Sequence, residues 1–395
     1  MKRPFEGVRI LDFTQVFAGP LASYQLALLG AEVIKVERPG GEDMRGRQAE
    51  GSTSPGWIAI NAGKKNIAMD LKHPEAVNVV KRLVAECDVV MENFRAGVMD
   101  RLGIGYDALK AVNPRLIYCC VSGFGREGPL SDDPAYDGKI QALSGIMSVT
   151  GHETTGPVRA GFAVCDATAG MTAAFAVSSA LFQRTHTGEG QLVDVAMYDS
   201  ALTMQAPAVG SYTMTGKVPG QSGNRAISGL PTADLFPVKG GYLLLAANNE
   251  KQFVALMHAI DRADVLEDRR FADWPARIEN EPALNEIIYA AFASADADSW
   301  EARLREHDVP CAQIQNVGEA VTHEQLAARN YMQTVDTHEG PVTLGTTGFQ
   351  LSEGGAALTA GFAHVGEHTE AVLTAAGFTI SEVSALKDSG AVSGA

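Results

Sequence analysis

One acidic side chain stands where an apolar run gives way to a long stretch of small residues. Asp166 follows the run 161–165, and the alanine-rich sequence 167–184 predicts a helix. Aspartate just before a helix is a preferred N-cap. The same place, close to a helix N-terminus, keeps a carboxylate ionised and suits a nucleophile that attacks a bound acyl group. From the residues alone, both a capping role and a nucleophilic role stay open for Asp166.

The sequence around Asp166 alternates between apolar strands and helices, which is the pattern that has to position it. Strands are expected at 9–14, 32–37, 66–71, 88–94, 116–122 and 191–197, with helices at 20–29, 74–86 and near 198–212. Strand–helix–strand units imply parallel strands, because the chain must cross over between them. The sequence therefore predicts a doubly wound α/β sheet that binds its ligand in loops at the carboxyl ends of the strands.

The composition changes after this alternation. Residues 213–231 are rich in Gly, Pro, Ser and Asn and are typical of a linker. A hairpin pattern at 233–247, turning at 239–241, and helical patterns up to 329 then predict a smaller α+β domain. We expect a large domain at 1–212, the linker at 213–231, the small domain at 232–330 and a final segment at 331–395. That segment carries strands at 331–335 and 342–347, a helix at 367–376 and a frayed tail at 388–395.

Charge and cysteine content limit the partners and the compartment. The 395 residues carry a net charge of −15, which argues against nucleic acid or an anionic membrane as the main partner. The five cysteines form no C-x-x-C pair, the N-terminal residues lack an apolar signal region, and no apolar run approaches a membrane span. A cytoplasmic protein is therefore expected. The basic residues that do follow strands suit a phosphate-rich ligand, and they are Arg38, Lys64, Lys65, Lys72, Arg95 and Arg101.

Two motifs match known patterns without their structural context. Residues 123–128 read G-x-G-x-x-G after a strand, but Pro129 and Pro134 predict a loop where a dinucleotide site needs a helix. A nicotinamide dehydrogenase is the function that this motif would support. Residues 364–368 read H-x-x-E-H, but Gly366 interrupts the helix that a zinc site needs. We therefore expect no metal site.

Several stretches resemble the family III CoA-transferases of the CaiB/BaiF type. They are GVRILDFTQVFAGP at 7–20, LGAEVIKVERP at 29–39, NIAMDLK at 66–72, ENFRAG at 92–97, NPRLI at 113–117, PAYD at 134–137, ALSG at 142–145, TGEGQ at 187–191 and GEHT at 366–369. The likeness extends over nearly the whole chain.

The resemblance implies a Rossmann-like large domain, closed by both ends of the chain, and a smaller domain inserted by long linkers. It implies an interlocked homodimer that binds acyl-CoA and a free carboxylic acid as substrates, with no permanently bound cofactor. Asp166 becomes the catalytic nucleophile and Asp137 an assisting acid beside it. The residues that it places against CoA are Gln15, Val16, Ala18, Arg38, Leu71, Lys72, Asn93, Phe94, Arg101 and Tyr136.

The chemistry that the resemblance implies is CoA transfer through covalent intermediates on Asp166. The carboxylate attacks the acyl-CoA to give a mixed anhydride, CoA thiolate returns to give an aspartyl-CoA thioester, and the acceptor acid is activated through a second anhydride. The likeness is to the branch that uses succinyl-CoA and short dicarboxylic acids. The stretch 228–231 lacks the glycine run of formyl-CoA transferases, which argues against oxalate and formyl chemistry, while carnitine-type substrates stay open. Arg225 is a candidate to bind a distal carboxylate.

Three alternatives stay open beside the transferase. The α-methylacyl-CoA racemases share the fold but need a histidine in a Gly-His-Asp motif, where this chain has Tyr136 between Ala135 and Asp137; His152 is the nearest other histidine. A nicotinamide dehydrogenase, which would rest on residues 123–128, is the second alternative, and a protein that binds CoA without catalysis is the third. Deuterium exchange at Cα of a 2-methylacyl-CoA without CoA transfer would favour the racemase.

Overall fold

The computed structural model describes residues 2–46 and 53–394. They form two compact units. The larger unit comprises Met1–Ile146, Arg159–Lys217 and Glu324–Ala395, and the smaller comprises Met147–Val158 and Val218–His323. Residues 218–231, which the composition assigned to a linker, thus belong with the smaller unit. Whether each unit is an independently folding domain with the expected boundaries stays a prediction.

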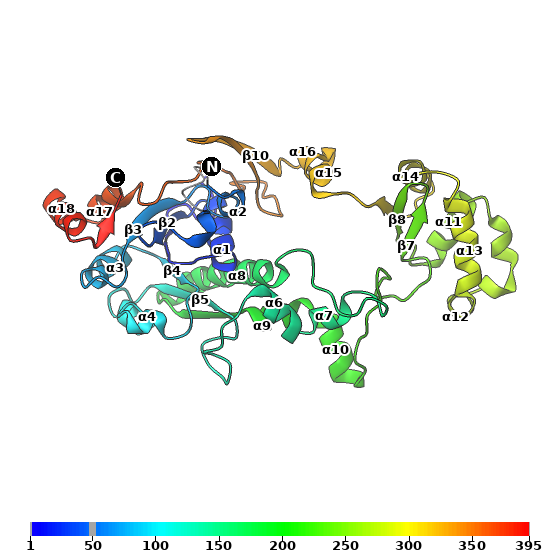
Figure 1. Cartoon of the computed structure of the whole chain (residues 1–395), viewed down its shortest axis with the longest axis horizontal. Helices are drawn as coiled ribbons and strands as arrows, with labels where there is room; N and C mark the ends of the chain where they lie inside the picture. Colours follow the sequence, from blue (N-terminus) through cyan, green and yellow to red (C-terminus); the bar gives the residue numbers. More distant parts are fainter. Residues whose placement is uncertain (1, 47–52, 395) are drawn as a thin grey trace. The chain divides into compact units, whose positions relative to one another are not determined.

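The larger unit is built around one sheet (Figure 1). The strands of that sheet are β1 (Arg9–Asp12), β2 (Glu32–Glu37), β3 (Lys65–Met69), β4 (Val89–Glu92), β5 (Ile117–Ser122), β6 (Leu192–Ala196) and β12 (Val392–Ser393). The larger unit also contains a separate two-stranded antiparallel sheet of β10 (Met332–Thr337) and β11 (Gly340–Gly345). Its helices are α1 (Ala18–Leu28), η1 (Asp43–Arg45), α2 (Pro55–Ile58), α3 (Ala76–Val84), α4 (Val98–Arg101), α5 (Tyr106–Lys110), α6 (Asp137–Leu143), α8 (Val164–Thr187), α9 (Met197–Met204), α10 (Ala206–Thr215), α16 (Glu324–Ala328), α17 (Thr369–Ala375) and α18 (Ile380–Asp388).

The sheet has the strand order β12-β3-β2-β1-β4-β5-β6. Strands β1 to β6 are all parallel to their neighbours, and β12 pairs antiparallel with β3 at the edge. The order 3-2-1-4-5-6 is that of the Rossmann fold, in which the strand order reverses between β1 and β4. The expectation of a mixed α/β fold with a large parallel sheet is confirmed.

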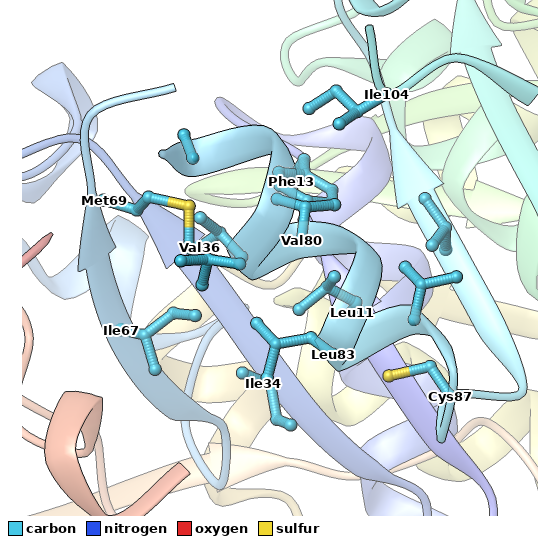
Figure 2. Close-up of a cluster of buried hydrophobic side chains, with 14 of the residues drawn as sticks. Leu11, Phe13, Ile34, Val36, Ile67, Met69, Val80, Leu83, Cys87 and Ile104 are labelled. Carbon is cyan, nitrogen blue, oxygen red and sulfur yellow. The ribbon is translucent and has the colours of Figure 1, made fainter. Parts of the chain in front are cut away.

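Both faces of the sheet are covered, because successive strand residues point to opposite sides. Leu11 and Ile34 face a cluster with Val80 and Leu83 of α3, as Figure 2 shows. Ile10 lies in a second cluster, which α1 and α8 cover from the other face. Each fully buried aliphatic side chain contributes about 1.5–3 kcal/mol, so the two clusters hold the strand ends rigidly in place.

Helix α8 passes the length and hydropathy criteria for a membrane span. It has 24 residues, and an 18-residue stretch of it has a mean hydropathy of 1.3, so the expectation that no run approaches a span is wrong on composition. The reason is its alanine and small-residue content, which suits close packing against α1 and the sheet. A buried core helix passes the same test, and 44% of this stretch is buried, so the match is weak evidence for a membrane.

The smaller unit is a three-stranded sheet with helices. Its strands are β7 (Leu235–Val238), β8 (Gly241–Leu245) and β9 (Cys311–Gln313), and its helices are α11 (Glu250–Ala259), η3 (Ala263–Glu267), η4 (Arg269–Phe271), α12 (Trp274–Glu279), α13 (Glu281–Phe292), α14 (Ala297–Glu306) and α15 (Val317–Thr322). Helix α7 (Ile146–Val149) begins in the larger unit and ends in the smaller. The hairpin of β7 and β8 agrees with the expected turn at 239–241.

The C-terminal region corrects the sequence analysis at one point. The expected frayed tail is wrong, because Val392 pairs with Met69 of β3 and is 2% exposed. Helix α18 precedes this strand and was not expected; Thr379 and Glu382 form a capping box at its start. The strand-forming signal was two apolar residues, Ala391 and Val392, within a tail of otherwise small and polar residues.

Candidate active site

A cavity of about 320 Å³ opens where the strand order reverses. Its walls are the loop after β1, the loop after β4, the end of β5 and the residues just before α6. Ligands of open α/β sheets bind in this crevice, because the loops on either side of the reversal diverge. Of the residues expected to form the site, those that line the cavity are Gln15, Val16, Ala18, Asn93, Phe94, Tyr136 and Asp166.

Asp166 lies in the first turn of α8 and not before it. The helix begins at Val164 with Ala163 as its N-cap, so the expected start at Ala167 and the capping role for the Asp166 side chain are wrong. The physical reason is that the helix N-terminus is capped by another part of the chain. Asp166 is thereby left half-buried, with its carboxylate at the cavity.

Asp137 supplies that cap. Its Oδ1 accepts hydrogen bonds from the backbone N–H of Cys165 at 2.8 Å and of Asp166 at 3.4 Å. Its Oδ2 accepts a bond from Gln141 at 2.5 Å and lies 3.5 Å from the guanidinium of Arg159. Asp137 itself is 6% exposed. The side chain therefore fixes the N-terminal turn that carries Asp166.

The electrostatic surroundings of Asp137 and Asp166 indicate different roles for the two carboxylates. Burial, and secondly the negative charge of Asp137, raise the pKa of Asp166 to about 6. A carboxylate with this pKa is still ionised at neutral pH and is more basic than an ordinary aspartate. Such a group in a cleft is a candidate for chemistry, whereas Asp137 is fully engaged in hydrogen bonds and an ion pair.

The loop between β1 and α1 forms the wall that includes Gln15, Val16 and Ala18. Val16 has φ = 66°, which is in the left-handed region that a β-branched residue rarely occupies. Such a conformation costs about 1–3 kcal/mol and persists only when its surroundings enforce it. Strained backbone conformations are concentrated at functional sites. The conformation of Val16 therefore indicates that the shape of this loop matters for the function of the site.

Asn93 clamps this loop to the loop after β4. Its Oδ1 accepts from the N–H of Gln15 and its Nδ2 donates to the carbonyl oxygen of Gln15, both at 2.7 Å. These two hydrogen bonds resemble those between paired strands. They join the loops on either side of the point where the strand order reverses. The structure thus gives Asn93 a scaffolding contact, and the expectation that it holds nucleotide stays a prediction.

Four of the expected CoA-binding residues lie outside the cavity wall. Arg38 follows β2 and is paired with Asp43 on the surface. Leu71 and the exposed Lys72 follow β3, and Arg101 ends α4. Within the part of the chain that the structure describes, the ammonium of Lys72 has no hydrogen-bond or ion-pair partner. Arg38 and Lys72 thus follow the same ends of the parallel strands as the cavity loops do.

Other residues reach the site without having been assigned to it. Arg95 and Phe17 line the cavity, as do Ser122 and Met197. Arg95 was noted as a basic residue at a strand end, which is the signal that could have placed it here. Arg159 had no such signal, because its contact with Asp137 joins segments 22 residues apart.

Arg225 is already engaged within the smaller unit. Its guanidinium donates to Glu281 through two nitrogens and to Asp234 at 3.2 Å. These carboxylates raise its pKa further. With three nitrogens bonded to carboxylates, its suggested role in binding a distal substrate carboxylate loses support.

The two discounted motifs form no helices. Residues 123–128 lie in a loop after β5, and residues 364–368 lie in coil and turn before α17, with Gly366 at φ = 73°. The expectation that neither motif has its helical context is confirmed. Across residues 2–46 and 53–394, no group of three or more His, Cys, Asp or Glu side chains has the arrangement of a metal site.

A doubly wound sheet with a half-buried carboxylate at a cavity beside its switch point is the arrangement of α/β proteins that bind a ligand at the strand ends. Residues 5–369 match CoA-transferase family III. The chain belongs to that family and is a transferase.

Named relatives and solved structures agree with this assignment. The chain is 34% identical over 87% of its length, and 88% of the relative, to a succinate–glutarate CoA-transferase of Agrobacterium fabrum. It is 37% identical over 84% of its length to an acetyl-CoA:oxalate CoA-transferase of Acetobacter aceti, covering 86% of that protein. A CaiB/BaiF family protein from Brucella suis superposes with a TM-score of 0.86 at 34% identity, covering 95% of this chain and all of that one.

Proposed function

We propose that this transferase moves CoA from an acyl-CoA donor, succinyl-CoA, to a short carboxylic or dicarboxylic acid. The observation that carries the proposal is Asp166, a half-buried carboxylate with a raised pKa at the wall of the switch-point cavity. The relatives are named for transfers between succinate and glutarate and from acetyl-CoA to oxalate, which supports small diacids as acceptors.

In the proposed mechanism, the Asp166 carboxylate attacks the thioester carbonyl and expels CoA thiolate, forming an aspartyl–acyl anhydride. The thiolate then attacks the aspartyl carbonyl, which releases the donor's free acid and leaves an aspartyl-CoA thioester. The acceptor carboxylate displaces CoA again through a second anhydride, and the returning thiolate attacks the acceptor carbonyl, releasing the new thioester and free Asp166. Each step exchanges one acyl bond for another, so no oxidant, metal or resident cofactor is required.

The surroundings of Asp166 suit this sequence. Asp137 holds the backbone of the first turn of α8, so we assign it a positioning role beside the nucleophile rather than a proton-transfer role. Its negative charge disfavours ionised Asp166 and thereby makes the carboxylate a stronger nucleophile. Gln15, Val16, Ala18, Phe94 and Tyr136 line the cavity that we assign to the thioester end of CoA.

We assign the charged part of CoA to the basic residues along the same strand ends. Arg38, Lys72 and Arg101 provide cations and Leu71 an apolar neighbour after β2, β3 and α4. Arg38 donates to the carbonyl oxygen of Gly41 at 2.7 Å, and its one ion pair is with the exposed Asp43. An exposed ion pair is worth little, so a phosphate can replace Asp43. Binding energy from these remote contacts would position the thioester against Asp166.

We also propose an interlocked homodimer in the cytoplasm. The supporting observation is an apolar surface on α8, where Phe175 is 74% and Phe182 is 69% exposed. An apolar groove of about 390 Å³ borders it, lined by residues of α1 and α8 together with Phe349 and Leu351. Exposed apolar area of this kind marks protein contacts. Substituting both phenylalanines with glutamate is expected to yield monomers in sedimentation velocity; an unchanged dimer would place the contact elsewhere.

The racemase alternative has less support. Tyr136 stands where the racemase motif has histidine, and among the described residues lining the cavity none is a histidine. His152 belongs to the smaller unit and packs against Gly223 there. A racemase needs two proton-transfer groups at the substrate Cα. Besides Asp166, the described residues of this cavity wall include one other carboxylate, Asp133, which forms an ion pair with Lys139 at 2.9 Å.

The test is to incubate the protein with succinyl-CoA and a panel of free acids and to identify new CoA esters by mass spectrometry. New esters with short diacids are expected, and Asp166→Asn should abolish them. Hydroxylamine or borohydride trapping followed by peptide mapping should place the adduct at residue 166. No ester from any acid, or an Asp166→Asn variant with normal exchange, would overturn the proposal.

A further inference from the structure

A buried ion pair lies directly behind the strained loop of the site. Lys35 of β2 and Glu42 are 3.0 Å apart, and their side chains are 1% and 5% exposed. Buried ion pairs are costly to desolvate and are weak evidence for stability. A pair this deep beside a catalytic loop therefore calls for a role other than stabilisation.

Both members of the pair bond to the backbone of the loop. Glu42 Oε2 accepts from the N–H of Val16 at 3.0 Å, while its Oε1 accepts from the indole N–H of Trp57. Lys35 Nζ donates to the carbonyl oxygen of Thr14 at 2.8 Å. The loop is thus held at two points, on either side of Gln15, by groups that also hold each other.

The contact of Glu42 falls on the residue with the unfavourable conformation. Val16 has φ = 66°, yet its side chain is 42% exposed and has little core packing to enforce that angle. A charge-assisted hydrogen bond from its N–H to a buried carboxylate is strong enough to do so. Trp57 and Lys35 in turn hold the Glu42 carboxylate in place, so Glu42 keeps its position if the loop moves.

A second buried ion pair, Asp12 with Lys64, also bonds to the backbone of Thr14. Asp12 Oδ1 accepts from the N–H of Thr14 at 2.9 Å, and Lys64 lies 3.2 Å from Asp12 Oδ2. This pair thus acts on Thr14, two residues before Val16, and makes no hydrogen bond to Val16. The buried charged residues beside this loop are thus Asp12, Lys64, Lys35 and Glu42. Of these four, only Glu42 has a hydrogen bond to Val16.

We infer that Glu42, oriented by Lys35, is a positioning residue that imposes the left-handed conformation of Val16 and so shapes the cavity wall shared with Asp166. Without this bond, Val16 relaxes to negative φ and the wall formed by Gln15, Val16 and Ala18 shifts. The effect falls on catalytic alignment more than on acyl-CoA affinity. The inference deepens the proposed function and rests on it.

A double-mutant cycle between Glu42→Gln and Val16→Gly isolates the effect, because glycine adopts positive φ without penalty. Glu42→Gln is expected to lower kcat about tenfold in the normal chain, with KM for acyl-CoA changed less than about threefold. In the Val16→Gly background the same substitution should lower kcat less than about threefold. Glu42→Asp should recover part of the loss.

Amide hydrogen exchange gives a readout that does not depend on activity. In the unmodified protein the exposed Val16 should have a protected amide, and Glu42→Gln should speed its exchange at least about tenfold. Glu250→Gln, which removes the carboxylate partner of the buried Arg277 in the smaller unit, is the matched control and should leave Val16 exchange unchanged. Where Glu42→Gln folds poorly, Lys35→Met with Glu42→Met removes both charges at once and retains an apolar filling.

The outcomes are distinct. Unchanged Val16 exchange, or a loss of kcat equal in both backgrounds, would overturn the inference even with a fully active parent enzyme. An inactive parent enzyme would overturn the proposed function, while Val16 exchange would still report whether Glu42 holds the loop.

Discussion

Oδ1 of Asp137 accepts a hydrogen bond of 2.8 Å from the backbone N–H of Cys165, so a carboxylate from one helix caps the N-terminus of another. Asp137 of α6 is thereby joined to the first turn of α8. Because the cap comes from elsewhere in the chain, the carboxylate of Asp166 in the same turn is left available at the cavity. Among the described residues, the Asp137 carboxylate accepts several hydrogen bonds, whereas the Asp166 carboxylate accepts none. This difference makes the site asymmetric.

The first prediction concerns the pH dependence of the first chemical step. Only ionised Asp166 attacks, and its pKa is raised to about 6, so exchange of labelled succinate into succinyl-CoA should rise with pH through about 6 and level off above it. Asp137→Asn removes a like charge and should move the midpoint to lower pH. A rate independent of pH between 5 and 7 would contradict this assignment.

The second prediction concerns stability at the nucleophile. The folded pKa of Asp166 is higher than the unfolded value, so between about pH 4 and 6 the folded state binds more protons and the free energy of unfolding falls as pH rises. Asp166→Asn avoids this penalty and should be more stable by about 1–3 kcal/mol above pH 6, with no gain below pH 4.

Denaturant unfolding at pH 4 and pH 7.5 measures that difference. Asp132→Asn, at an exposed position before α6, is the matched control and should change stability by less than about 0.5 kcal/mol at either pH. A destabilised Asp166→Asn variant at pH 7.5 would show that Asp166 is held by interactions that favour its charge.

The third prediction concerns the clamp between the two loops. Asn93→Ala removes both hydrogen bonds to Gln15 and should lower kcat about 10- to 100-fold, because a small displacement of the cavity wall misaligns the thioester. Steady-state kinetics, with CoA affinity measured separately by calorimetry, distinguish alignment from nucleotide binding. Asn78→Ala, on the exposed face of α3, is the control. A variant that loses CoA affinity with unchanged kcat would instead support the expected nucleotide-binding role.

The fourth prediction concerns the contact between α1 and α8. A Cβ on Gly170 would lie 2.6 Å from the carbonyl oxygen of Ala18 and 3.1 Å from Leu21. Gly170→Ala should therefore cost about 1–3 kcal/mol through overpacking, despite the better helix propensity of alanine, and should also reduce activity because Ala18 lines the cavity.

Thermal unfolding measures the cost at Gly170. Gly210→Ala in α10 is the matched control, because the nearest atom to its added Cβ is the flexible end of Met214 at 3.4 Å. That control should be neutral or stabilising by up to about 1 kcal/mol. Equal changes in stability from Gly170→Ala and Gly210→Ala would contradict a close contact between α1 and α8.

Much of the sheet could be predicted from the sequence. Each expected strand from 9–14 to 191–197 overlaps an observed one, because buried parallel strands are continuous apolar runs that report their own position. The errors lie where a distant segment decides the local structure. Val392 became a strand because β3 offered an open edge, and α8 began three residues before Ala167 because Asp137 capped it.

The sequence by itself determined the parallel sheet and the family, because local periodicity and contiguous motifs carry that information, and it singled out Asp166 as the candidate nucleophile. Only the tertiary structure decided that Asp137 caps the helix that carries Asp166, that Asn93 clamps Gln15, and that Glu42 reaches Val16. These contacts join residues 26 to 78 positions apart. No local pattern encodes them, since they arise only when the fold brings the strand ends to one edge of the sheet.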